Sequence, residues 1–443
     1  MQILFNFLNT PKVRIFILIF VDMKRVLVSL AVLLAAITLS GQEKESAPKK
    51  GWVFTPMPDF SYNSDLGVNL GAFCDFFYYG DGTIYPNFHH HIAVAAAWAT
   101  KGAWYVHGMF DSHSLVPGAR VTASLTFRDA SANNFYGFNG IAAPFDETLD
   151  ANRQTRTAYY NNHKQVIRAA AVVQREGKGQ VNWMGGLVFR HIRLQDYDLS
   201  NYNSGNSLWL AYQEVGLIRA DEAHGGSSLE LKGGFTYDTR DVELFPGKGI
   251  YGELYLNGNL DLSHKRYHYA QVVAHFRHFV PIIYSRLTLA YHIGLQHQFL
   301  GEMPYYNLSE ISTLLYQYEE YEGLGSRYTI RGYKYDRILA PGIAWANIEL
   351  RATCFKFDFL KQHIALILMP FMDLATITRT YRLEEQKTLP GLCQDRKVPI
   401  MLSGGIGGAI HINANMTLGI DFGKALDPQL NDFTIGMHST YMF

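Results

Sequence analysis

The chain is poor in cysteine: it has three, Cys74, Cys354 and Cys393, and their wide spacing matches no metal site. An odd number of dispersed cysteines defines no disulfide framework. Acidic and basic residues balance at 39 each, so the basic excess of a nucleic-acid-binding protein is missing too. Composition does not change along the chain, which predicts one large domain.

Long apolar runs are confined to the N-terminal region. After residue 41 no uninterrupted apolar stretch reaches the ~18 residues of a transmembrane helix. The run 26–39 follows Met23-Lys24-Arg25 and precedes the small residues Ser40-Gly41, the pattern of a secretory signal. We predict a signal peptide over 1–41 with cleavage near Gln42. No cysteine follows the run, so no lipoprotein anchor is expected. A second apolar run at 15–20 leaves open that 1–22 is an over-extended start.

Alternating polarity dominates the rest of the chain. In 228–238, 250–259 and 286–299, apolar residues occupy one face of an extended segment and polar residues the other. Long alternating segments repeated over a whole chain are typical of a transmembrane barrel, whereas the strands of soluble sandwiches are shorter. Tyr and Phe, 28 each, suit the aromatic girdles of such a barrel. The fifteen candidate strands are 66–76, 88–99, 103–111, 119–128, 164–176, 181–193, 228–238, 250–259, 266–279, 286–299, 342–352, 364–375, 402–412, 415–423 and 433–443.

The fold class is therefore all-β, a transmembrane antiparallel barrel. Such barrels close with an even number of strands, so we predict sixteen, with the missing strand at 154–161. That choice puts the long segment 129–153 at the end where short turns are expected. Counted back from the C-terminus, the connections alternate in length, and 300–341 falls on the side of the long, external loops. On the last strand, Tyr441 and the terminal Phe443 resemble the signal by which outer-membrane barrels are recognised for assembly, although His438 stands where that pattern usually has glycine.

Four motifs resemble those of one family of barrels. The segment 300–341 contains Ile330-Arg331-Gly332-Tyr333, and the two strands that follow contain Asn347-Ile348-Glu349-Leu350-Arg351 and Phe371-Met372-Asp373-Leu374-Ala375. Upstream lie Asp238, Arg240 and Asp241, followed by Pro246 and Gly249. In sequence and order these are similar to motifs of the bacterial surface antigen superfamily of outer-membrane barrels, which includes the insertase BamA and the translocation subunit TamA.

The resemblance implies an external loop folded into the lumen, with Arg331 reaching across to Glu349 and Asp373. A guanidinium inside a barrel needs carboxylate partners, and a carboxylate on an otherwise apolar strand needs a cation. Gly332 and Tyr333 complete this internal-loop latch, and Asp238, Arg240, Asp241, Pro246 and Gly249 form a separate family segment. The latch either holds a plug in place or takes part in transport, and the residues alone favour neither.

The resemblance covers the barrel, 61–443. We interpret 42–60 as a short periplasmic lead segment, because the POTRA modules that the family carries there exceed its length: a chain below ~40 residues does not bury an adequate core.

Three other clusters of residues do not predict a metal site, a hydrolase triad or a phosphate loop. His89-His90-His91 would point to both faces of a strand and has no nearby ligand at metal spacing. Asp111-Ser112-His113 has the residue types of a hydrolase triad, but adjacent strand residues face opposite ways. The glycine-rich 404–408 lies in a strand without the helix of a phosphate loop. We therefore predict no catalytic, cofactor or metal site.

The function implied by the resemblance is insertion or translocation of protein, or of lipid, at the outer membrane of a Gram-negative-type bacterium. The strand edges that pair with an incoming strand would lie at the seam, the junction between 66–76 and 433–443 where the barrel closes. A channel or uptake porin gated by the internal loop is the first alternative, and an outer-membrane phospholipase-type enzyme the second. The expected partners are outer-membrane lipid, the barrel-assembly machinery and a separate periplasmic or secreted protein, with no nucleic acid.

Overall fold

The computed structural model describes residues 49–438 except 86–87, 151–157, 176–179, 198–204, 244, 285, 315–322, 326, 360–361, 390, 395–399, 413–415, 428–429 and 431. The predicted signal peptide, the cleavage position near Gln42, and Tyr441 and Phe443 lie outside the described residues.

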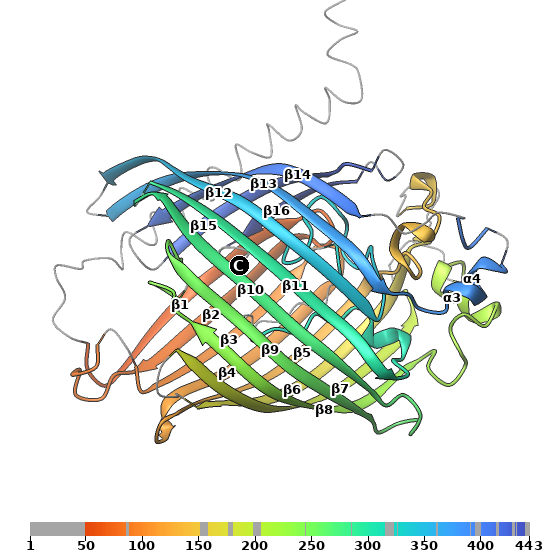
Figure 1. Ribbon diagram of the computed structural model, residues 1–443, viewed down its shortest axis with the longest axis horizontal. Helices are drawn as coiled ribbons and strands as arrows, with labels where there is room; N and C mark the ends of the chain where they lie inside the picture. Colours follow the sequence, from red (N-terminus) through yellow and green to blue (C-terminus); the bar gives the residue numbers. More distant parts are fainter. Residues whose placement is uncertain are drawn as a thin grey trace, which may run out of the picture.

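Sixteen antiparallel strands close into a barrel, each hydrogen-bonded to its neighbours in sequence and the first to the last (Figure 1). The fold class and the strand number are thus confirmed. The strands are β1 (Trp52–Asn63), β2 (Gly67–Tyr78), β3 (His90–Ala99), β4 (Ala103–Val116), β5 (Ala119–Asn134), β6 (Asn161–Arg175), β7 (Val181–Asp196), β8 (Gly225–Asp238), β9 (Gly249–Asp261), β10 (Tyr269–Ile283), β11 (Leu287–Gly301), β12 (Gly342–Phe359), β13 (Gln362–Arg379), β14 (Met401–Ile412), β15 (Met416–Ala425) and β16 (Phe433–His438).

The first strand corrects the sequence prediction. β1 begins at Trp52, inside the predicted lead segment 42–60, and so 66–76 corresponds to the second strand. Pro56 and Pro58 prevented the prediction of β1 from the sequence, because proline lacks the N–H that a central strand donates and is tolerated mainly on edge strands. Among the described residues, β1 is in register with β2 along its whole length but with β16 at one position, so it has an edge on which proline fits.

The strand predicted at 154–161 is absent from its described part. Ala158 to Tyr160 have turn or irregular backbone, and Asn161 begins β6. Replacing this strand by β1 leaves the total unchanged and moves the connection 135–160 to the other end of the barrel. That connection then joins the long loops 197–224, 302–341 and 380–400 at one end, as an outer-membrane barrel requires.

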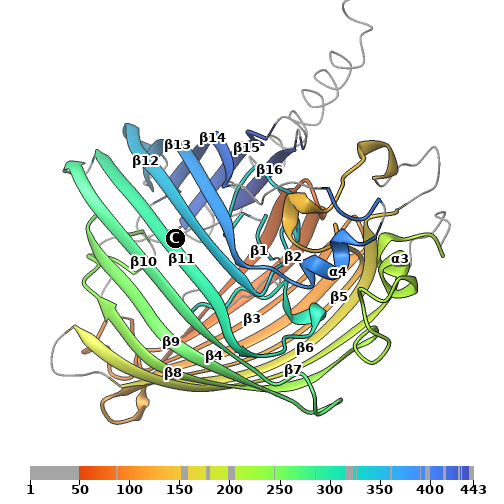
Figure 2. The same ribbon diagram turned by 45° about the vertical axis from the view of Figure 1, so that its right-hand side comes forward.

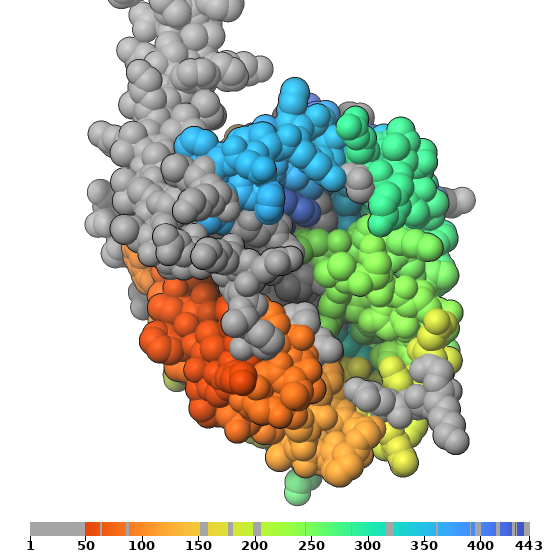
Figure 3. Space-filling model, turned by 90° about the vertical axis from the view of Figure 1, so that its left-hand side faces the viewer, coloured from red at the N-terminus to blue at the C-terminus, as the bar shows by residue number. Residues whose placement is uncertain are grey.

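The two faces of the strands differ as the alternation predicted. On β9, Leu254 and Leu256 are 56% and 55% exposed on the outside, while Glu253 and Asn257, which flank them, are 3% and 0% exposed on the lumen side. Polar side chains become fully buried inside a barrel only where something fills the lumen. Seen from the end with the short turns, the strands form a ring in colour order around a central hollow (Figure 3).

The long loops close the opposite end. They carry the short helices α3 (Leu208–Glu214) and α4 (Leu383–Lys387) and the 3-10 turns Gly140–Ala142, Glu147–Leu149 and Tyr305–Asn307, which gather over that mouth (Figure 2). No helix in the described part of the chain has the length and apolar character to cross a membrane.

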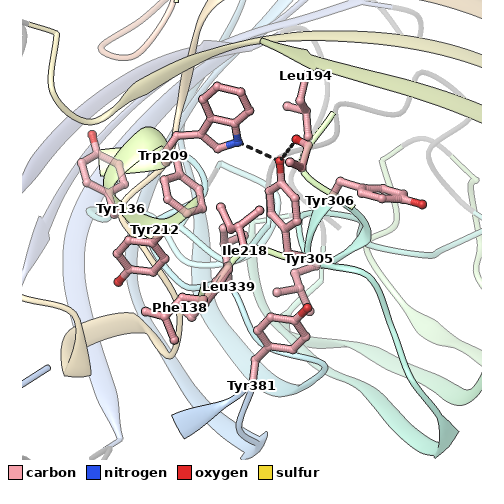
Figure 4. Packing of buried hydrophobic residues seen from close by; sticks show 14 of the residues in the cluster. Tyr136, Phe138, Leu194, Trp209, Tyr212, Ile218, Tyr305, Tyr306, Leu339 and Tyr381 are labelled. Atoms are coloured by element: carbon pink, nitrogen blue, oxygen red, sulfur yellow. Dashed lines mark hydrogen bonds between the residues drawn. The ribbon is translucent and has the colours of Figure 1, made fainter. Parts of the chain in front are cut away.

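An aromatic core holds these loops together. Phe138, Trp209, Tyr212, Tyr305 and Tyr381 come from four different loops (Figure 4). Phe138 meets Tyr212 and Tyr381 edge to face, and the Trp209 indole donates to the Tyr305 hydroxyl at 2.7 Å. We call this assembly the cap. Its buried side chains make it a packed layer rather than a set of independent loops.

Candidate functional site

The loop 302–341, between β11 and β12, runs through the lumen. In the half of the loop that leads to β12, Leu324 and Ile338 form a β-bridge. Ile330 and Arg331, which lie between these two residues in the chain, are buried. An irregular segment can be buried in this way only if its polar groups find partners. The partners lie on three parts of the barrel wall.

Arg331 is the centre of the first set of contacts. Its Nη1 lies 2.6 Å from Glu349 Oε2 on β12, and its Nε and Nη2 donate to the two carboxylate oxygens of Asp373 on β13, each at 2.9 Å. The backbone N–H of Arg331 also donates to Asp373, at 2.9 Å. The guanidinium packs 3.5 Å from the ring centroid of Phe371. Glu349 and Asp373 thus occupy both edges of the donor fork, a geometry that an ammonium does not reproduce.

A second arginine and a third carboxylate lie beside the latch. Arg351 Nε contacts Glu349 at 3.1 Å, while Asp421 on β15 lies 4.0 Å from Arg331. Burial by itself would lower the pKa of Arg331, but the facing carboxylates of Asp373 and Glu349 raise that pKa above its ordinary value. Asp421 was not predicted from the sequence. The available signal was a carboxylate on a strand face otherwise made of threonine, glycine and alanine.

Gly332 and Tyr333 bring the loop against the last strands. Gly332 has φ +88, and a Cβ built there would lie 2.7 Å from the Lys424 carbonyl carbon, so a side chain fits neither the backbone conformation nor the space. Its N–H donates to Thr434 Oγ1 on β16 at 2.9 Å, and the Tyr333 hydroxyl donates to the Leu402 carbonyl at 3.1 Å. The five predicted latch residues therefore lie in one continuous region of the lumen.

A second anchor, which the sequence did not single out, holds residues 310–314, the outgoing limb of the loop, on β9 and β11, the part of the wall that continues from β12. Glu253 on β9 accepts hydrogen bonds from Leu314 N at 2.9 Å and Thr313 Oγ1 at 3.1 Å. Gln296 on β11 accepts from Ser312 N at 2.9 Å and donates to the Glu310 carbonyl at 2.7 Å. In the sequence these side chains resemble any other polar residue on a lumen face, so no pattern distinguished them.

The family segment around Asp238 lies at the other end of the barrel, away from the latch. Arg240 binds both oxygens of Asp238 and stacks on Tyr251, and Asp241 accepts from the N–H groups of Gly247 and Lys248 within the β8–β9 turn. Pro246 is buried, and Gly249 has φ +109 with backbone atoms where a Cβ would stand. These residues shape a turn.

That turn also reaches across the lumen at its short-turn end. Glu243 lies 3.2 Å from Arg120 on β5, and Phe245 packs on Ile367, Met369 and Ala409 of β13 and β14. The latch and the family segment around Asp238 therefore make their contacts in different parts of the lumen.

Over the described residues, the seam between β1 and β16 is the least paired junction in the barrel. β1 and β16 are in register there only at Asn63 and Gly436, with one further hydrogen bond from Ser64 N to the Ile435 carbonyl at 3.1 Å. Every other neighbouring pair is in register over at least six positions. The seam had been predicted at 66–76, whereas it lies at β1.

The clusters that were set aside have structural partners. Ser112 is fully buried, and its hydroxyl accepts from Leu115 N at 2.9 Å within a strand irregularity, while Asp111 pairs with Arg120. His91 contacts Asp75, and His89 and His90 contact serines on β4. No group of metal-ligating side chains occurs in the part of the chain that the structure describes.

Fold and site together define a membrane-type barrel whose lumen holds a latched loop and whose closing seam is short. The chain belongs to the Omp85 superfamily: the domain of that family matches residues 107–418. The family predicted from the four motifs is thereby confirmed. Barrels of this superfamily are outer-membrane proteins that serve generally in protein insertion or translocation.

Two solved structures illustrate the likeness. BamA from Haemophilus ducreyi lacking POTRA domains 1–3 is similar at a TM-score of 0.55 and 16% identity, over 89% of this chain and 71% of that one. CdiB from Escherichia coli is similar at a TM-score of 0.55 and 10% identity, over 89% of this chain and 63% of that one, so the chain spans less than two thirds of that structure. At these identities the likeness is one of fold. No curated protein matches the sequence.

Proposed function

We propose that this barrel inserts or translocates polypeptide at the outer membrane by opening the β1–β16 seam and pairing an exposed edge with an incoming strand. The single observation that carries the proposal is the seam itself, with one register pair among the described residues. Unpaired N–H and C=O groups on a strand edge are a template for another strand. The short junction makes this edge the least costly one to expose.

The sequence of β1 supports the same role. Pro56 and Pro58 lack N–H groups and weaken any continuous ladder on the seam side, so complete closure of the seam would be disfavoured. The other strands contain long continuous ladders, such as the eleven register pairs from Leu287–Ala352 to His297–Gly342 between β11 and β12. Such ladders keep the rest of the wall closed while the seam opens.

The channel alternative predicts a continuous path through the lumen. The cap and the latched loop both lie across such a path, and the buried aromatic cluster would have to separate before solutes pass. These features favour the insertase or translocase. The enzyme alternative would need an accessible nucleophile, and its first candidate, Ser112, is buried.

In this proposal the protein is integral to the outer membrane of a Gram-negative-type bacterium. It contacts outer-membrane lipid and depends on the barrel-assembly machinery for its own insertion. A separate periplasmic or secreted protein is the expected source or recipient of the polypeptide.

A seam-locking disulfide tests the proposal. Asn63→Cys with Gly436→Cys, in a chain whose three native cysteines are replaced by serine, joins the two residues that face each other across the seam. The matched control, Gly258→Cys with Ala270→Cys, joins β9 to β10, which are already paired. Both variants are placed in liposomes, and folding of a urea-unfolded outer-membrane barrel is followed by heat-modifiable gel migration.

We expect the oxidised seam variant to lose its acceleration of folding and to regain it on reduction, with the control active in both states. Equal activity of oxidised and reduced seam variants would refute seam opening. Ion conductance of the unmodified protein without any folding activity would favour the channel instead.

A further inference from the structure

The internal loop touches both sides of the seam. Loop residues 327–335 reach β16 on one side and the end of β1 on the other, in addition to the latch on β12 and β13. We infer that this segment is a clamp that holds the seam closed, and that Asp65 is the residue through which β1 is tied to it. The inference deepens the proposed function and rests on it.

The contacts on the β16 side involve backbone and side chain. Gly332 N donates to Thr434 Oγ1 at 2.9 Å, and Arg327 Nη1 donates to the Met437 carbonyl at 3.2 Å. A Cβ built on Gly423 of β15 would lie 2.6 Å from Gly332 N, which shows how closely the loop lies on the last strands. β16 is therefore held from inside the lumen by groups that are not part of any strand.

The contacts on the β1 side converge on Asp65, in the turn that follows β1. Asp65 Oδ2 accepts from Tyr335 N at 3.2 Å, and Oδ1 accepts from Asn134 Nδ2 at 2.8 Å. Asn134 Nδ2 also contacts the Tyr335 carbonyl at 3.2 Å. Asp65 stands two residues after Asn63, which is in register with Gly436 of β16. A hydrogen bond to Asp65 thus fixes the β1 end at the point where the seam closes.

Charge around Asp65 reinforces the tie. Burial raises the pKa of the Asp65 carboxyl, and Asn134, Lys334 and Lys101 act in the opposite direction. Lys101 Nζ donates to the Ser64 carbonyl at 2.7 Å, so the same turn is held from the β3–β4 side. Hydrogen bonds to an ionised acceptor are stronger than those between neutral groups.

The loop adds contacts across the seam that are comparable in number to the direct ones. Among the described residues, direct closure consists of one register pair and the Ser64 N to Ile435 O bond, whereas the loop supplies two hydrogen bonds to β16 and one to Asp65. The clamp segment is itself fixed by Arg331 to β12 and β13. Releasing the loop would therefore release the seam, which gives the latch a role beyond that of a plug.

Crosslinking across the seam measures how readily the seam opens, and it needs no unfolded barrel as folding client. In the Asn63→Cys, Gly436→Cys chain described above, the rate of disulfide formation under mild oxidant reports how often the two strands are apposed. Asp65→Ala removes the tie to β1, and Thr434→Val removes the hydroxyl on β16 at nearly constant shape. The matched control is Asp129→Ala, whose carboxylate binds His163 and Gln165 between β5 and β6, away from the seam.

We expect Asp65→Ala to shift the seam-opening equilibrium by about tenfold, the effect of one hydrogen bond to a charged acceptor, and Asp129→Ala to have no effect. Thr434→Val should shift it in the same direction and by less. Parent-like crosslinking in both Asp65→Ala and Thr434→Val would overturn the clamp. If Asp65→Ala does not assemble, Thr434→Val decides alone.

The folding assay then separates the two ideas. If Asp65→Ala makes the seam open more often and makes the barrel fold its client faster, both the clamp and the proposed function are supported. A seam that opens more often with no change in client folding supports the clamp and overturns the proposed function. Unchanged crosslinking overturns the clamp, while the disulfide-locked barrel still tests the proposed function independently.

Discussion

Replacing Arg331 by alanine is the sharpest test of the latch. The change removes three side-chain hydrogen bonds, one to Glu349 and two to Asp373, and leaves both carboxylates buried. Breaking a buried ion pair by removing one partner costs about 3–5 kcal/mol, because the remaining charge is neither hydrated nor paired. Arg351 stays on Glu349 at 3.1 Å and offsets part of that cost, whereas Asp373 loses its guanidinium partner.

Two further variants divide the charge effect from the geometry. Neutralising the carboxylates as well, with Glu349→Gln and Asp373→Asn in the Arg331→Ala chain, should restore part of the lost stability, since no unpaired charge then remains. Arg331→Lys should recover part of the loss and no more, because an ammonium keeps the charge and lacks the planar fork.

The assay combines stability with loop placement. The free energy of unfolding is measured by urea titration of the refolded barrel, and loop placement by trypsin access at Lys334 and Arg337 in intact cells. Arg337 is fully buried in the native protein, so cleavage there requires the loop to move. Arg240→Ala is the matched control: it removes an arginine of the other family segment, whose partner Asp238 is 38% exposed and whose pair is worth about 1 kcal/mol or less.

The reasoning fails if Arg331→Ala matches the parent in both unfolding free energy and trypsin access. It also fails if the triple variant is less stable than Arg331→Ala, because removing the stranded charges could not then be a gain.

Three other predictions address separate parts of the molecule. Gly332→Ala should lower the yield of assembled barrel more than Gly205→Ala, since both have positive φ but only Gly332 faces backbone atoms at 2.7 Å; heat-modifiable migration compares them. Burial raises the pKa of Asp336 to about 6, above its unfolded value, so the folded state loses stability as pH rises from about 4 to 6. Asp336→Asn should therefore stabilise the protein at pH 8, by about 3 kcal/mol at most, with little effect at pH 4, and urea titrations at the two pH values would reveal the opposite order if the sign is mistaken. Deleting Phe443 should reduce assembled barrel more than synthesis, as immunoblots of heated and unheated samples can show, and equal amounts would count against the terminal signal.

Much of the fold could be predicted because a barrel strand must change polarity at every residue. The outward leucines of β9 and the buried Glu253 and Asn257 that flank them follow from that rule alone. The latch residues were candidates for a related reason, because Arg331 in a loop and Asp373 on an apolar strand are costly without partners; the resemblance to the family supplied their pairing. The strand β1 could not be predicted in this way, since Pro56 and Pro58 interrupt its alternating pattern.

The sequence by itself thus determined which residues face the lumen and which charged groups need a partner. The tertiary structure alone decided the neighbours: that Asp65 meets Tyr335, that Thr434 meets Gly332, and that Glu253 holds the outgoing limb of the loop. Alternation assigns a side chain to one of two faces, and it is the same on every strand. Which strands close the ring, and which lumen groups a loop then reaches, depends on contacts between residues that lie hundreds of positions apart in the chain.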